Sequence, residues 1–236
     1  MRNLHQAYYK DYFKNLDFGY LLNNGEGPKS DIKRRNADLI ANNLLQKIPK
    51  NSLANQTFEL EIAYPGLVTG VGINHEAKIE GEFKLGVHFD WTYGMPVVYG
   101  SSVKGVLRAY FMDFYSPNKG QPNAKDAFND IFEGGKKSIY DRDIFFDAVL
   151  VKADTKGRIL CSDSITPHGD NPLKNPIPIT FLKIAPGCKL EFRFKLVDTK
   201  IGDDVFKKED KLKLFQKILT TIGVGAKTNV GYGQLK

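Results

Sequence analysis

The chain is poor in the residues that build metal sites and disulfide frameworks. Its 236 residues include two cysteines, Cys161 and Cys188, and four histidines. The cysteines form no C-x-x-C pair, so no zinc framework or disulfide scaffold is indicated, which fits a reducing cytoplasm. The N-terminus is too polar for a signal peptide, and its apolar runs are too short for a membrane helix. We therefore expect a cytoplasmic protein with no cofactor, no metal and no membrane partner.

Acidic residues are fewer than basic residues. The sequence has 34 Lys and Arg residues against 27 Asp and Glu residues, a net charge of +7. From Lys207 to Lys236, seven lysines stand against Glu209 and Asp210. An excess of positive charge favours an anionic partner, most simply nucleic acid. Because 42% of the residues are hydrophobic, a chain of this length can still bury a large core.

A complete nucleotide-binding loop is missing too. The last fourteen residues, GVGAKTNVGYGQLK, carry four glycines and a Lys-Thr pair. A Walker A loop has glycine directly before the lysine and a helix directly after the pair, whereas here Ala226 precedes Lys227 and only eight residues follow Thr228. This argues against an NTPase. The stretch still suits an anion, since glycine lets backbone N–H groups approach a phosphate. The plain alternative is a turn between a helix and an edge strand.

The spacing of apolar residues predicts an α+β fold. The expected helices are 31–48, 101–114 and 208–222, and the expected strands are 57–64, 144–151, 190–197 and 230–236. This order of strand, helix, strand, strand, helix and strand is the ferredoxin-like βαββαβ pattern, shared with RRM-type RNA binders. The segments expected to be irregular are 65–99, 116–142 and 161–187.

The first fifty residues are expected to form a helical extension to this core. Asp31 is the expected N-cap of the helix at 31–48, whose apolar residues follow a helical period. These residues are Ile32, Leu39, Ile40, Leu44 and Leu45. An upstream aromatic group is expected in the core: Tyr8, Tyr9, Tyr12 and Phe13.

The stretch YGSSVKGVLRAYF, residues 99–111, combines features that bind phosphate. Ser101 or Ser102 can cap the helix, and Lys104 and Arg108 are four residues apart, so they share a helical face. A helix N-terminus with two stacked cations attracts anions. The alternative is a capped amphipathic helix with a solvated basic face. In a ferredoxin-like fold, this helix start and the C-terminal loop can converge on one nucleic-acid backbone.

Two motifs carry a family resemblance. Residues 100–108 read Gly-Ser-Ser-hydrophobic-Lys-Gly-x-hydrophobic-Arg, and residues 223–233 read Gly-x-Gly-x-Lys-Thr-x-x-Gly-Tyr-Gly. Together they resemble the RAMP superfamily of CRISPR proteins and, within it, the sixth-subunit family of the Cmr (type III-B) effector complex. The run TGVGINHE, the run FDWTYGMPVVYGSSVKG and the block from IFFDAVLV to NPIPITFLKIAPG are similar to that family as well. The resemblance extends from Leu67 to the C-terminus.

The resemblance implies a single RAMP domain over 1–236, with a helical N-terminal extension at 1–50 and a modified ferredoxin-like core at 57–236. It implies a non-catalytic subunit at the end of a ribonucleoprotein filament, near the 3′ end of the CRISPR guide RNA. Its partners would be guide and target RNA and other RAMP subunits, and a different subunit would cut the target. Carried over, the RNA-binding residues are Ser101, Ser102, Lys104, Arg108, Gly225, Lys227, Thr228 and Gly231.

Two other classes of function remain open. Some RAMP proteins cleave guide precursors without metal, using a histidine base, for which the candidates here are His75, His88 and His168. No pair of these has the spacing of a catalytic dyad, and His88, inside VHFDW, is expected to be packed. Asp163, His168 and Asp170 are a weak metal-binding constellation. The third class is an assembly protein without RNA contact, against which the basic charge argues.

Overall fold

The computed structural model describes residues 3–15, 29–41, 44–70, 79, 81–83, 86–134, 137–166 and 178–236, with only the backbone described at 29 and 30. The helices are α1 (Leu4–Tyr9), η1 (Asp11–Phe13), α3 (Lys29–Ala41), α4 (Gly100–Phe114), α5 (Ala124–Phe128), the π-helix η2 (Asn129–Glu133), η3 (Ile139–Asp141), α6 (Lys208–Ile222) and η4 (Thr228–Val230). The strands are β1 (Gln56–Glu61), β2 (Val97–Val98), β3 (Ile144–Phe145), β4 (Ala148–Lys152), β5 (Leu160–Ile165), β6 (Ile179–Ile184), β7 (Lys189–Lys195), β8 (Thr199–Ile201) and β9 (Asp204–Phe206).

The main sheet is antiparallel and has the strand order β1-β7-β4-β2, with β3 also paired to β7. At the outer edge of β1, Leu235 forms a bridge with Ile62. The N–H groups of Glu61 and Ala63 donate to the carbonyls of Lys236 and Gln234. In terms of the predicted four-strand core, β1 is the first strand, β3 with β4 the second, β7 the third and the C-terminal segment the fourth. Across the sheet these strands lie in the order fourth, first, third, second. This is the ferredoxin-like arrangement, so the predicted α+β fold is confirmed.

Two of the predicted strands are less regular than expected. The segment 230–236 pairs through a single bridge instead of forming a full strand. The segment 144–151 is divided at Phe146 and Asp147 into β3 and β4, which both pair with β7. Asp147 lies in this break, and its carboxylate accepts a hydrogen bond from the backbone N–H of Gly100 at 2.7 Å.

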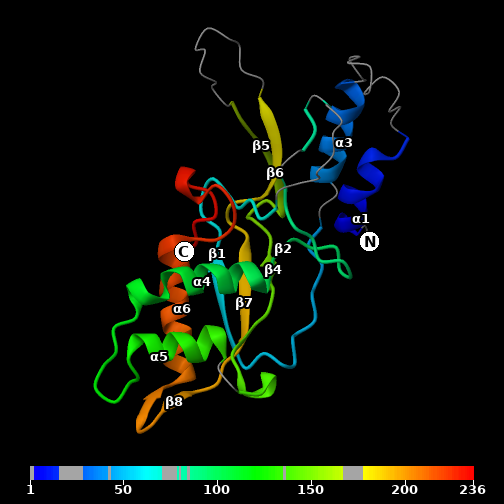
Figure 1. The fold of residues 1–236 in the computed structure, drawn as a ribbon. Coiled ribbons are helices and arrows are strands. Elements are labelled where there is room, and N and C mark those ends of the chain that lie inside the picture. Colours follow the sequence, from blue (N-terminus) through cyan, green and yellow to red (C-terminus); the bar gives the residue numbers. More distant parts are fainter. Residues whose placement is uncertain are drawn as a thin grey trace.

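The helices α4 and α6 contact each other and cover the same side of the sheet (Figure 1). The interface is aromatic: the ring of Phe215 on α6 lies 5.7 Å from Phe194 on β7 and 5.8 Å from Phe145 on β3. Phe111 on α4 packs edge-on to Phe132 at 5.5 Å. Burial of these large rings is the main favourable contribution to folding here. The predicted helices at 101–114 and 208–222 are confirmed.

The N-terminal extension packs on the loop that precedes β2. Tyr8 is fully buried and donates from its hydroxyl to the carbonyl of Phe83 at 2.9 Å. Tyr12 is also buried and accepts from the N–H of Phe83 at 3.2 Å. The core prediction is confirmed for these two residues. It is wrong for Tyr9, which is 36% exposed because it lies on the outer side of α1.

The helix predicted at 31–48 has different ends in the structure. It starts at Lys29, so Asp31 lies in its first turn and is not the N-cap. It ends at Ala41, and Leu44 is 73% exposed instead of packed. A carboxylate in the first turn still stabilises the helix through its dipole.

All three segments predicted to be irregular contain regular structure, although 65–99 holds only the two-residue strand β2. Residues 124–133 form α5 and η2, where Ala127 and Ile131 face the core one turn apart. Residues 160–184 contain the antiparallel hairpin of β5 and β6, which projects beyond the main sheet (Figure 1). The prediction of a loop was therefore wrong at 124–133, 161–165 and 179–184, while residues 167–177 lie outside the described residues. No helix in the described part of the chain is both long and apolar enough to cross a membrane.

Candidate nucleic-acid interface

The start of α4 is fixed by contacts with β3 and β4. Tyr99 is the N-cap and makes no side-chain capping bond, while Asp147 accepts the N–H of Gly100. A Cβ atom on Gly100 would lie 2.9 Å from the carbonyl carbon of Phe146, so the close approach requires glycine. Asp147 therefore takes the capping role that was predicted for Ser101 or Ser102, and that prediction was wrong.

Because Asp147 caps the helix, both serines lie in the first turn with exposed side chains. Neither hydroxyl hydrogen-bonds to another described residue, and the N–H of Ser101 has no partner among them. The N–H groups of Ser102 and Val103 both bond to the Tyr99 carbonyl. A phosphate at this helix start would therefore meet one N–H and two hydroxyl groups.

Lys104 and Arg108 lie over one side of α4, as their spacing predicts. The Nζ of Lys104 is 5.9 Å from the ring centre of Phe145, and the guanidinium of Arg108 is 5.7 Å from that of Phe128. Arg108 also forms an ion pair with Glu133 at 2.5 Å, with both side chains about half exposed. Such a surface pair contributes little stability, so a phosphate can compete with Glu133 for Arg108.

The C-terminal loop runs beside the segment that follows β1. The N–H of Ala226 donates to the carbonyl of Val68 at 2.8 Å. Gly225 has a positive φ of 90°, and a Cβ there would lie 2.7 Å from a methyl group of Leu67. Gly225 is thus needed for backbone packing, which agrees with the plain turn interpretation, although its own backbone is exposed.

The rest of the loop is a short turn open to solvent. Lys227 adopts the left-handed conformation, with φ of 61°, and is the N-cap of η4. Thr228 begins η4, and Gly231 ends it with φ of 94°. A Cβ on Gly231 would meet only a ring carbon of Pro65, at 3.8 Å. All three residues are partly exposed, so the turn can present backbone N–H groups and one charge to an anion.

A polar triad anchors this loop to the β5–β6 hairpin. The carboxylate of Asp163 accepts hydrogen bonds from Lys183 Nζ at 2.5 Å and from the Tyr232 hydroxyl at 2.8 Å. Burial alone would raise the pKa of Asp163, but these two bonds and the Ser164 N–H lower it below its usual value. Burial and the bond to Asp163 raise the pKa of Tyr232 to about 12. Asp163 therefore positions the loop.

The structure does not join the two predicted RNA-binding segments directly. The start of α4 contacts Phe145 to Asp147, whereas the C-terminal loop contacts Leu67 and Val68. Within the described ranges, no hydrogen bond or ion pair links one segment to the other. Their convergence on a single RNA backbone stays a prediction.

The histidine and metal candidates gain little support. His88 is half-buried and stacks on Tyr99 with 4.5 Å between ring centres, so it is packed as expected. Burial lowers its pKa below the usual value. His75, His168 and Asp170 lie outside the described residues. In the ranges that are described, no three His, Cys, Asp or Glu side chains are placed to hold a metal ion.

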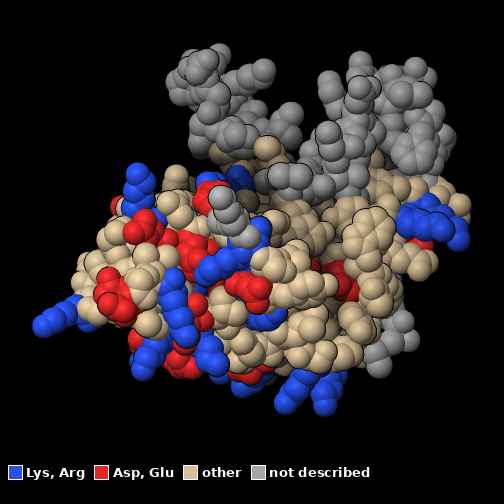
Figure 2. Space-filling model, turned by 60° about the horizontal axis from the view of Figure 1, so that its bottom comes forward, with Lys and Arg blue, Asp and Glu red and all other residues tan. Residues whose placement is uncertain are grey.

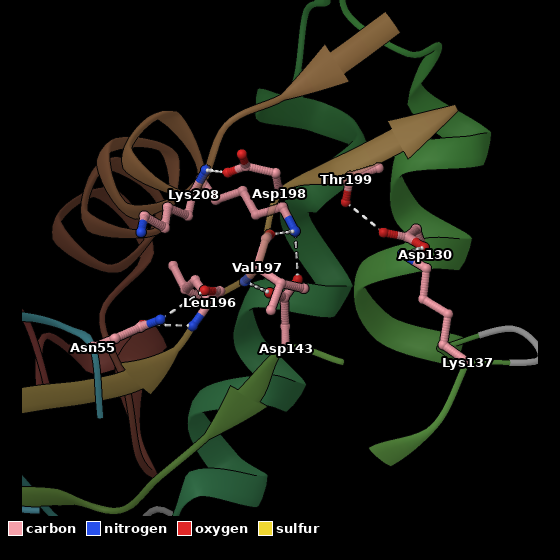
Figure 3. Close-up of polar contacts among 10 residues, drawn as sticks. Asn55, Asp130, Lys137, Asp143, Leu196, Val197, Asp198, Thr199 and Lys208 are labelled. Atoms are coloured by element: carbon pink, nitrogen blue, oxygen red, sulfur yellow. Dashed lines mark hydrogen bonds and ion pairs between the residues drawn. The ribbon is translucent and has the colours of Figure 1, made fainter. Parts of the chain in front are cut away.

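A buried polar cluster lies at the start of α6 (Figure 3). The Nζ of Lys211 donates to Asp143 at 2.6 Å and to the Val197 carbonyl at 2.7 Å, and the side chains of Lys211 and Asp143 are 0% and 1% exposed. Close by, the Thr199 hydroxyl donates to Asp130. Burial lowers the pKa of Lys211 and raises that of Asp143, while the charge of each opposes the shift of the other. Since no ligand can reach this pair, it holds α6 to the strands.

The positive charge does not form one large patch on the face drawn in Figure 2, where Lys and Arg side chains alternate with Asp and Glu. Uncharged residues cover much of the surface toward the right of that view. RNA contact through this face would therefore rest on a few placed cations and not on a broad basic field.

Sequence reasoning missed Asp147, Lys183 and Tyr232, which position the candidate residues. Asp147 and Lys183 act through contacts with residues more than fifteen positions away, which no local pattern reveals. Tyr232 was visible as the aromatic residue in Gly-Tyr-Gly, but its bond to Asp163 depends on a hairpin that was predicted as a loop.

Comparison with known proteins gives matches over most of the chain. The model of the RAMP superfamily matches residues 59–236. A curated relative, CRISPR system CMR subunit Cmr6 of Saccharolobus solfataricus, is 29% identical over 158 residues, which cover 64% of this chain and 48% of the relative. The chain thus spans about half the length of that relative.

Solved structures are similar at lower identity. A chain in the cryo-EM structure of the type III-B Cmr-beta bound to cognate target RNA is 22% identical with a TM-score of 0.54, covering 76% of this chain and 57% of that one. The crystal structure of Cmr6 from Pyrococcus furiosus is 19% identical with a TM-score of 0.36, covering 76% of this chain and 96% of that one. The first likeness shows the fold alone, and the second is too low to support a conclusion.

Proposed function

The chain belongs to the RAMP superfamily, and on that premise we propose that it is a non-catalytic RNA-binding subunit of a type III-B CRISPR (Cmr) effector ribonucleoprotein in antiviral defence. In this role it contacts the guide RNA, or the guide–target duplex, near the 3′ end of the guide. It packs on other RAMP subunits of the same complex. Its place of action is the cytoplasm, with which its two free thiols are compatible.

The proposal draws on the relatives and on charge. The relative from Saccharolobus solfataricus is named as a Cmr subunit, and the net charge of +7 suits a phosphate backbone. We further propose that residues 1–236 form one RAMP domain, with the extension at 1–50 as part of it. Support for this comes from the hydrogen bond of Tyr8 to Phe83 and from the contact of α3 with β5.

One observation carries the RNA-binding role: the start of α4 is exposed and has unused donors. Ser101 and Ser102 present hydroxyl groups there, and Lys104 lies one turn further on. A helix N-terminus with hydroxyl groups and a cation is a site for a phosphate oxygen. Arg108 adds a second cation once it exchanges Glu133 for phosphate.

The C-terminal turn supplies a second contact in this proposal. The candidate residues lie in η4 or beside it: Gly225, Lys227, Thr228 and Gly231. The triad of Asp163, Lys183 and Tyr232 holds this turn in place. Contacts of this kind reach the sugar–phosphate backbone and do not read bases. The subunit therefore binds RNA regardless of guide sequence, as an effector loaded with many guides requires.

Salt-dependent RNA binding tests the proposal. Lys104→Ala, Arg108→Ala and Lys227→Ala should each weaken binding to single-stranded RNA uniformly across sequences. Each should also reduce the slope of log affinity against log salt by about 0.7 in magnitude, the value for one phosphate contact. The measurement is fluorescence anisotropy of labelled RNA over a salt series.

Lys213→Ala is the matched control, because Lys213 is 78% exposed on α6 outside both segments. It should change neither affinity nor slope. If it weakened binding as much as the three variants do, the binding would be a general charge effect. If Lys104→Ala altered sequence preference, the backbone-contact model would be wrong.

A further inference from the structure

Five aromatic side chains in two groups make up what we call the aromatic strip: His5, Tyr9 and Trp91 in one group, and His88 and Tyr99 in the other. The ring centre of His5 lies 4.2 Å from that of Trp91 and 4.7 Å from that of Tyr9. His88 stacks on Tyr99 at 4.5 Å with 22° between the planes. The two groups share one loop, because His88, Trp91 and Tyr99 all lie on the segment in which the N–H of Val97 donates to the carbonyl of His88 at 2.9 Å.

The strip lies over buried aromatic side chains of the core, Tyr8 and Phe89. Trp91, the one tryptophan of the sequence, is 75% exposed. Tyr9 is partly exposed, and its ring lies 5.0 Å from fully buried Tyr8 and 6.5 Å from fully buried Phe89. Single exposed apolar residues are common, but here exposed Trp91 is in tilted ring contact with His5, which also contacts Tyr9.

The backbone around Trp91 is held rigidly. Asn3 donates from its side-chain amide to the Trp91 carbonyl at 3.3 Å. The carboxylate of Asp90 accepts the N–H groups of Thr92 and Tyr93, so its charge is used within the turn. Gly94 lies so close to α1 that a Cβ there would be 2.7 Å from the Leu4 nitrogen. Fixing the turn keeps the indole presented to solvent at low entropic cost on binding.

The strip leads directly to the candidate phosphate site. Tyr99 is the N-cap of α4, so the end of the strip lies next to Ser101 and Ser102. At its other side, exposed Lys10 follows Tyr9 at the end of α1. Stacking rings beside phosphate-binding groups are the two components of single-strand binding surfaces.

We propose that the aromatic strip stacks bases of single-stranded RNA, while the start of α4 contacts the neighbouring phosphates. The inference rests on the proposed RNA-binding function and names the form of RNA bound. The chemistry favours RNA over a protein partner, because every ring of the strip carries a polar nitrogen or hydroxyl and the strip borders cations and free donors. A protein interface centre would instead be apolar.

Trp91 supplies its own probe, because its emission reports only on this position. We would titrate the full chain with a pyrimidine-rich single-stranded RNA oligonucleotide and with an RNA duplex of equal length. The single strand should quench the Trp91 emission with the same midpoint as the anisotropy of labelled RNA. The duplex should bind without quenching, since its bases are already stacked inside the helix.

Variants separate stacking from charge. Trp91→Ala should weaken single-strand binding about tenfold while leaving the salt slope unchanged, because stacking releases no counterions. Trp91→Phe keeps a ring and should restore most of the affinity. Tyr140→Ala is the matched control: Tyr140 is 78% exposed on η3 and belongs to no part of the strip.

The results distinguish this inference from the function on which it rests. If single-stranded RNA binds by anisotropy, but Trp91 emission does not change and Trp91→Ala binds normally, the strip is refuted and the RNA-binding function stands. If Tyr140→Ala matches the loss in Trp91→Ala, the strip is equally refuted. If neither RNA binds at low salt, both proposals are wrong.

Discussion

Two glycines of α4 have opposite environments. Gly100 lies against the backbone of Phe145 and Phe146, and a Cβ there cannot be accommodated. Gly105, in the middle of the same helix, is exposed, and no described heavy atom beyond its own stretch of helix lies within 4 Å of where its Cβ would be. Glycine inside a helix costs about 1 kcal/mol relative to alanine. No contact in the described fold requires glycine at position 105; in the proposed RNA-binding role, the missing side chain lets a phosphate approach the helix.

Gly105→Ala should therefore stabilise the isolated chain and weaken RNA binding. The free energy of unfolding should rise by up to about 1 kcal/mol, and the affinity for RNA should fall because the methyl group keeps a phosphate from the helix. Urea unfolding and an RNA titration measure the two effects. Gly100→Ala is the contrasting variant and should lose stability. Unchanged affinity in Gly105→Ala would show that RNA does not approach this part of α4.

His88 gives a prediction for pH. Burial lowers its pKa in the folded state below the usual 6.5, so the unfolded chain binds the proton more readily. Neutral His88 therefore contributes its full share to the free energy of unfolding above pH 6.5. That contribution is lost as the pH falls from 6.5 through the lower pKa of His88 in the folded protein. Thermal melts across this window should show a smaller loss in His88→Phe, which keeps the ring on Tyr99. Equal pH dependence in both proteins would contradict the buried neutral imidazole.

At the scale of elements, one buried ion pair adds to the aromatic contact between α6 and β3. Lys211 on α6 and Asp143, directly before β3, are both removed from solvent and hydrogen-bonded (Figure 3). Breaking such a pair leaves an uncompensated buried charge, whereas replacing both members by apolar residues avoids that penalty.

Lys211→Met should thus destabilise the protein by about 3–5 kcal/mol. The double variant Lys211→Met with Asp143→Leu should recover most of that loss. Urea unfolding of the single and double variants completes the comparison, with Lys213→Ala on the exposed side of α6 as the neutral control. If the double variant were as unstable as the single one, the pair would act through more than charge compensation.

How well the sequence predicted each element depended on local pattern. The strands β1 and β7 and the helix α6 carry clear apolar periods, such as Leu190, Phe192 and Phe194, and were correctly predicted. The hairpin of β5 and β6 was missed because apolar and polar residues alternate only weakly along its strands. Several prolines also lie between the two strands in the sequence. The early end of α3 at Ala41 was missed because apolar Leu44 extended the apparent period.

For the whole molecule, the ferredoxin-like order of strands and the family were predicted, but the arrangement of the candidate site was not. Ser101, Ser102 and Lys104 were placed on the correct helix, yet the cap came from Asp147, 47 positions away from Gly100. The role of Gly225 in packing on Leu67 could not be read locally either. Contacts between distant segments decide both points, and no periodicity encodes them.

The central claim is that the chain binds RNA without cutting it. A gel-shift and cleavage assay in one tube tests this most directly, with labelled guide-like RNA, purified protein, and magnesium either present or absent. The account predicts a shifted, intact RNA under both conditions. Specific cleavage that is lost in His75→Ala or His168→Ala would instead identify a ribonuclease and contradict the account.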